Sequence, residues 1–153
     1  MCISLSHTGV AQDRNDIQIA NEYVLKGEKE KALTVYQNLA KNLANIPLIH
    51  NDYLNLMLDL GSYKDAEDYV DKLIKRYDDR TSYRLDLGLI WMKAGDVQKA
   101  ERYFKSIIKS YAGDLYRIKS ISDYLGAHRL TEYAVLALQE ARQASGNSTL
   151  FTL

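Results

Sequence analysis

The chain has 153 residues, which is long enough for one domain with a substantial hydrophobic core. Lysine and arginine together number 20, as do aspartate and glutamate, so the formal net charge is zero and the basic surface typical of a nucleic-acid binder is not expected. The single cysteine, Cys2, excludes an intramolecular disulfide framework, and no stretch approaches the roughly 20 apolar residues that would span a bilayer.

Residues 1–12 (MCISLSHTGVAQ) precede the first periodic segment and carry no charged side chain other than His7. Their sequence has two interpretations. The small residues Gly9 and Ala11 would suit cleavage after Ala11 at the end of a secretory signal, which would place the protein outside the cytoplasm, in the periplasm or secreted. Otherwise the segment is a disordered N-terminal extension of a cytoplasmic protein.

From residue 13 onward, apolar residues recur mostly at three- and four-residue steps, which predicts amphipathic helices and no strands. The first expected helix, 13–26, leads to Gly27, and the second, 29–43, would bury Ala32, Tyr36 and Leu39. The third, 47–60, opens with Pro47, where a missing backbone N–H costs nothing. It leads to Gly61 and then to a fourth helix at 63–77.

The later helices follow the same plan. The fifth, 81–94, is followed by Gly95, where a helix can exit through the left-handed conformation that glycine adopts freely. Asp96 would then cap the sixth helix, 97–111. The seventh and eighth, 115–127 and 131–144, are degenerate, because Arg129 stands where the turn glycine would be.

Small residues repeat through these helices with a fixed period of 34 residues. The repeated positions are Ala32, Ala66, Ala100 and Ala134, and, five residues earlier in the first three units, Gly27, Gly61 and Gly95. Such a period predicts an array of stacked helical hairpins, with repeats at 13–46, 47–80, 81–114 and 115–148. The alanines would let the two helices of a hairpin converge near their turn.

Residues 149–153 would begin a fifth repeat, which suggests a fragment of a longer array. The alternative is that Leu150, Phe151 and Leu153 fold back onto the last hairpin as a cap.

This layout resembles the tetratricopeptide repeat (TPR). Besides the glycines and alanines, the chain matches the family pattern at the small residue of the first helix (Ala20, Gly88), the aromatic that follows it (Tyr23, Trp91) and the aromatic of the second helix (Tyr36, Phe104). It departs from the pattern at Leu54 and Leu73, and no repeat ends with the family's proline. The resemblance covers residues 13–148 and implies an all-α, right-handed solenoid of four hairpins and eight helices.

The resemblance also implies that the first helix of each repeat lines a concave groove. The groove positions include Asn21, Asn51 and Asn55, whose amides could hold a peptide backbone with both a donor and an acceptor. They also include Leu85, Leu89 and Met92, which would favour an apolar or helical ligand. The simpler interpretations are that the asparagines are only solvated and that the next repeat partly covers the aliphatic stripe.

No pattern indicates catalysis, a cofactor or a metal: the histidines lie far apart, and no phosphate loop or nucleophile–base set is present. Aspartates on the first helices disfavour an RNA-reading array. Ile17 and Asn51 stand where a carboxylate clamp would need lysine. We therefore expect a non-catalytic module that binds a protein or peptide partner. The alternatives are a scaffold that self-associates through its open repeat end and a fragment of a larger TPR protein whose activity lies elsewhere.

Overall fold

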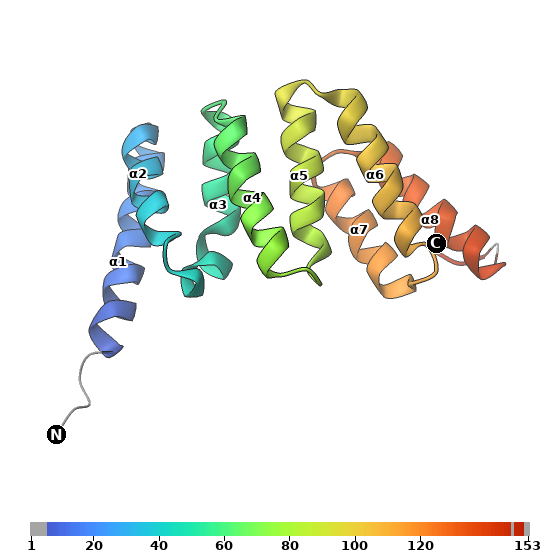
Figure 1. Cartoon of the computed structure of the whole chain (residues 1–153), viewed down its shortest axis with the longest axis horizontal. Coiled ribbons are helices and arrows are strands. Elements are labelled where there is room, and N and C mark those ends of the chain that lie inside the picture. The colour runs from blue at the N-terminus through green and yellow to red at the C-terminus, as the bar shows by residue number, and fades with distance from the viewer. Residues whose placement is uncertain (1–5, 148, 152–153) are drawn as a thin grey trace. The chain divides into compact units, whose positions relative to one another are not determined.

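The computed structural model describes residues 6–147 and 149–151, which form eight α-helices and one short 3₁₀ helix and contain no strand (Figure 1). The prediction of an all-α chain of helical hairpins is therefore confirmed. The chain divides into two compact units, Met1–Ser62 and Tyr63–Leu153. The division falls inside the second expected repeat, between its two helices, so each unit is described by itself.

The first unit contains α1 (Ser6–Leu25), α2 (Lys29–Leu39), the 3₁₀ helix η1 (Leu43–Asn45) and α3 (Ile46–Asp59). Helix α2 packs against both α1 and α3. Helix α1 begins earlier than the expected residue 13, while residues 1–5 lie outside the described residues, so both interpretations of residues 1–12 stay predictions.

Helix α2 ends at Leu39 instead of residue 43, because two asparagines bind the backbone that follows it. The side chain of Asn42 accepts a hydrogen bond from the N–H of Ala44 at 3.1 Å, and the side chain of Asn45 donates to the carbonyl of Leu39 at 3.2 Å. Such local side-chain bonds compete with helix continuation.

The second unit contains α4 (Tyr63–Arg76), α5 (Thr81–Ala94), α6 (Val97–Tyr111), α7 (Leu115–Ala127) and α8 (Thr131–Ser145), all within one residue of the expected bounds. Each helix packs against the next, and α5 also packs against α7 and α6 against α8. This pattern is that of stacked hairpins, in which corresponding helices of successive hairpins are neighbours. The core between them includes Leu85, Phe104, Ile108, Ile121 and Leu125.

All four turns inside the expected repeats close in the same way. Each contains one left-handed residue: Gly27, Gly61 and Gly95 have φ of 75°, 70° and 92°, and Arg129 has φ of 61°. The N–H of the following residue bonds the carbonyl five residues back, at 2.9 Å in every case: Glu28 to Tyr23, Ser62 to Met57, Asp96 to Trp91 and Leu130 to Leu125. The fourth turn thus keeps the geometry without glycine.

The repeated alanines lie in the packed interior: Ala32, Ala66 and Ala100 are fully buried, and Ala134 is 8% exposed. Residues after α8 also contact this interior, because Leu150 and Phe151 pack against the core of the second unit. Arg142 holds them, donating from Nε to the carbonyl of Leu150 at 2.6 Å and from Nη2 to that of Phe151 at 3.2 Å. Leu153 lies outside the described residues, and the fifth repeat stays a prediction.

Candidate functional site

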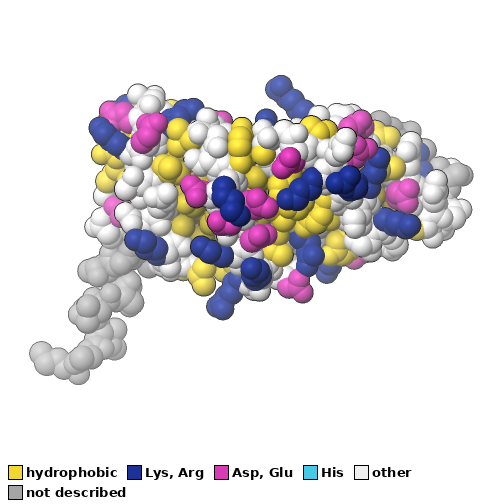
Figure 2. Space-filling view, turned by 45° about the horizontal axis from the view of Figure 1, so that its top comes forward, with side chains coloured by type: hydrophobic (Ala, Val, Ile, Leu, Met, Phe, Trp, Pro, Cys, Tyr) yellow, Lys and Arg dark blue, Asp and Glu magenta, His cyan; other side chains and the backbone are white. Residues whose placement is uncertain are grey.

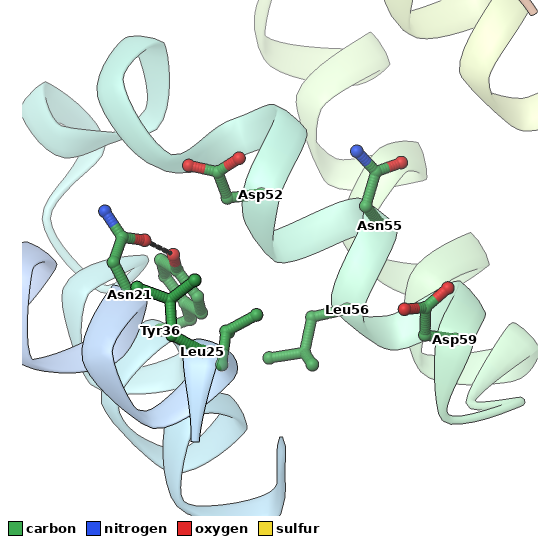
Figure 3. A pocket seen from close by; sticks show the side chains of 8 residues that line it. Asn21, Leu25, Tyr36, Asp52, Asn55, Leu56 and Asp59 are labelled. Atoms are coloured by element: carbon green, nitrogen blue, oxygen red, sulfur yellow. Dashed lines mark hydrogen bonds between the residues drawn. The ribbon is translucent and has the colours of Figure 1, made fainter. Parts of the chain in front are cut away.

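The first unit contains a pocket of about 380 Å³ at the surface of its three α-helices (Figure 3). The lining residues come from the end of α1, from one aromatic ring of α2 and from side chains along one face of α3. The lining residues are Asn21, Val24, Leu25, Tyr36, Asp52, Asn55, Leu56 and Asp59.

Helical spacing explains why these residues meet. On α3, Asp52, Asn55 and Asp59 follow one another at three- and four-residue steps, so their side chains share one face of the helix. On α1, Asn21 and Leu25 are four residues apart and share a face for the same reason. The pocket therefore combines amide, carboxylate and aliphatic groups from two helices over the ring that α2 supplies.

Tyr36 fixes the amide of Asn21. The tyrosine side chain is fully buried, and its hydroxyl donates to Oδ1 of Asn21 at 2.5 Å (Figure 3). Burial, together with the nearby charge of Asp52, raises the pKa of Tyr36 to about 12, so the hydroxyl keeps its proton even in moderately alkaline solution. With its oxygen engaged, the Asn21 amide keeps its N–H₂ group to donate to a ligand.

The two carboxylates give the pocket a negative charge, since no lysine or arginine lines it. Asp59 pairs with Nζ of Lys29 at 3.1 Å. Within residues 6–147 and 149–151, the carboxylate of Asp52 forms no ion pair and accepts no hydrogen bond. The amide of Asn55 is likewise exposed and makes no hydrogen bond within the described part of the chain.

The structure brings together some of the predicted ligand residues but not all. Asn21 and Asn55 both line this pocket, while Asn51 is exposed on α3, one turn from Asn55, and is not part of the lining. Leu85, Leu89 and Met92 belong to α5 in the second unit.

The aliphatic residues predicted on α5 are largely covered, as the simpler of the two sequence interpretations expected, and their contact with a ligand stays a prediction. Leu85 is 2% exposed and Leu89 is 4% exposed, and Met92 is half-buried against the core of the second unit. Leu85 itself belongs to that core, beside Phe104 and Ile121. Leu85 and Leu89 are therefore packed mainly inside the protein, while Met92 keeps part of its surface.

A second pocket, of about 560 Å³, lies in the second unit between the start of α5 and α7. Arg80, Arg117 and Asp79 are its charged lining residues, and Arg117 is already paired with Asp114 at 3.4 Å. At one side the hydroxyl of Tyr124 donates to Asp86 at 2.5 Å, and burial raises the pKa of Tyr124. Leu85, one of the predicted ligand residues, lines this pocket. The hydrogen bond from Tyr124 to Asp86 was not predicted, because nothing in the repeat pattern pairs these two residues.

Positive and negative side chains alternate over the face shown in Figure 2, without a large patch of one sign. Within the described residues, no group of histidine, cysteine, aspartate and glutamate is arranged to hold a metal ion. None of the described helices is long and apolar enough to cross a membrane.

In a comparison with known families, residues 83–114 fit the family model of the tetratricopeptide repeat. The matched segment spans most of α5 and all of α6, and it holds the left-handed Gly95 and the buried Ala100 and Phe104. Comparison with curated proteins finds no match.

Proposed function

Because the chain carries a tetratricopeptide repeat at residues 83–114, a motif that typically builds non-catalytic interaction modules, we propose that it binds a peptide or helix of a partner protein in the pocket of its first unit. The observation that carries the proposal is the position of two amides. Asn21 and Asn55, which occupy equivalent positions of two successive repeats, line the same pocket.

The chemistry of the pocket supports a peptide as the ligand. A carboxamide can donate to a peptide carbonyl and accept from a peptide N–H, and two amides on α1 and α3 would hold a segment at two points. Leu25, which is 87% exposed, offers apolar surface beside them. Asn51, one turn from Asn55, would lengthen the surface along α3 in this proposal.

Asn55 is the residue to change first. Its side chain is exposed and bonded to nothing in the described chain, so Asn55→Ala should leave folding intact. Asn21→Ala is less informative, because it would also deprive the buried hydroxyl of Tyr36 of its acceptor. The matched control is Asn38→Ala, an exposed asparagine on α2 that does not line the pocket.

The test is a pull-down from an extract of the source cells with wild type, Asn55→Ala and Asn38→Ala, quantified by mass spectrometry. A partner held by the pocket is expected with wild type and Asn38→Ala, and at least severalfold less with Asn55→Ala, while the three proteins melt alike. Equal recovery of every captured protein by all three would place the binding surface elsewhere. Light scattering of the wild type tests the self-association alternative. That alternative requires the molecular mass in solution to rise with protein concentration.

A further inference from the structure

We infer that the pocket of the first unit selects a segment with a basic side chain, lysine or arginine, which would place its charged group against Asp52. This inference rests on the proposed function and specifies the ligand of that same pocket. It is argued from the charges that line the pocket, from the engagement of Tyr36 and from the apolar surface beside Asp52.

The charges of the pocket are unbalanced. Asp52 and Asp59 lie two turns apart on the same face of α3, on either side of Asn55 (Figure 3). Lys29 compensates only Asp59, through a pair whose side chains are 39% and 63% exposed. Pairs this exposed contribute little and can be exchanged for another cation. One negative charge, that of Asp52, therefore remains for a ligand to neutralise.

The neighbouring hydroxyl cannot take over this role. Tyr36 lies close enough to Asp52 for the carboxylate to raise the tyrosine's pKa, yet its proton is donated to Asn21. A phenol hydroxyl has one proton, so Tyr36 cannot donate to Asp52 without breaking its bond to Asn21. Asp52 is therefore left with solvent until a ligand arrives.

The apolar residues explain why the cation should sit on a long side chain. Leu25 and Val24, which are 87% and 37% exposed, line the pocket from α1 and give it an apolar surface. The methylene stem of lysine or arginine can lie on such a surface while its charged end remains hydrated or paired. An acidic side chain would meet two carboxylates, and a purely apolar one would desolvate Asp52 without a partner.

A selection from a random-peptide phage library tests the inference, with immobilised wild type, Asp52→Asn and Glu30→Gln. Glu30→Gln removes an equal charge from an exposed position on α2 that does not line the pocket. Wild type and Glu30→Gln should enrich peptides with lysine or arginine at one shared position, and Asp52→Asn should lose that enrichment. All three proteins should show the same helix content and the same melting temperature.

A double-mutant cycle on the best selected peptide makes the result quantitative. Replacing its shared basic residue by glutamine should weaken binding to wild type by roughly threefold to tenfold in fluorescence anisotropy at low salt. The same replacement should change binding to Asp52→Asn by less than about twofold, because the interaction is already lost. An equal loss with both proteins would overturn the assignment of Asp52.

The outcomes separate this inference from the proposed function. Peptides that bind wild type in the pocket but show no basic preference would overturn the inference and leave the peptide-binding function standing. A wild-type protein that enriches no peptide above background would count against both.

Discussion

A Cβ atom at position 88 would lie 2.4 Å from Cε1 of the Phe104 ring, so the contact between α5 and α6 depends on a glycine. The ring cannot easily yield, because Phe104 is fully buried and its centroid lies 5.4 Å from that of Tyr133. Gly88 is therefore needed for a close approach of two helices, although glycine in a helix interior is otherwise unfavourable.

Replacing Gly88 by alanine should lower the free energy of unfolding by about 1–3 kcal/mol, because the added methyl group overpacks the interior. Urea denaturation followed by circular dichroism measures it. Gly126 is the matched control: it lies in α7, and a Cβ there would meet nothing within 4 Å. Gly126→Ala should raise the free energy of unfolding by roughly 0.5–1 kcal/mol through helix propensity. A Gly88→Ala variant as stable as wild type would contradict the role given to Phe104.

Replacing Arg129 by glycine should stabilise the protein by about 1 kcal/mol. Its φ of 61° places a residue with a Cβ in the left-handed region, which costs roughly 1–2 kcal/mol. Glycine avoids this cost, but it also makes the unfolded chain more flexible, which offsets part of the gain in stability. The reciprocal change is Gly95→Ala, at the equivalent turn with φ of 92°, and it should destabilise by a similar amount. Thermal melts of both variants would refute the argument if the two shifts had the same sign.

Stability should fall at alkaline pH partly through Tyr36. Its pKa is about 12 in the folded protein against an ordinary 10.0, so the folded state holds the phenol proton more tightly than the unfolded state. The resulting stabilisation is complete below pH 10 and is lost as pH rises through about 12. Urea denaturation across this range should show a shallower decline for Tyr36→Phe. An unchanged slope would show that Tyr36 titrates normally.

Replacing Arg142 by glutamine should lower the free energy of unfolding by about 1 kcal/mol, because it removes two hydrogen bonds to the backbone carbonyls of Leu150 and Phe151. Arg102→Gln, at an exposed position on α6, is the control and should change stability by no more than a few tenths of a kcal/mol. If both variants melted alike, the contact of residues 149–151 with α8 would contribute nothing measurable.

The helix ends were predictable where the sequence carries its own stop signals. Helices α5, α6 and α7 have the predicted bounds, and α5 ends at the left-handed Gly95 as expected. Asp96 precedes α6 as predicted but makes no side-chain capping hydrogen bond, whereas Asp114, which was not predicted, caps α7 by accepting from the N–H of Arg117. The early end of α2 was not predictable, because it depends on where the side chains of Asn42 and Asn45 find backbone partners. The positions of asparagines in a helical pattern do not indicate whether their side chains will bond the backbone.

The candidate site was predictable only in part. Repeat position alone pointed to Asn21 and Asn55, which line one pocket. The bond from Tyr36 to Asn21 was not foreseen, since a tyrosine at core spacing gives no indication of where its hydroxyl points. Whether Leu89 is buried could not be decided from the sequence, because a leucine on the face of a helix gives the same sequence signal whether it meets a ligand or a neighbouring helix.

The turn at Arg129 bears on how far such a protein can diverge. If the surrounding helices hold a left-handed turn in place with arginine, a repeat can mutate away from the residues that identify it and still fold to the same shape. Residues 83–114 match the family model, and the hydrogen bond that closes their turn recurs at the other three turns. At these four turns the backbone geometry is therefore the same although the residue is not, so geometry identifies this turn more consistently than glycine does.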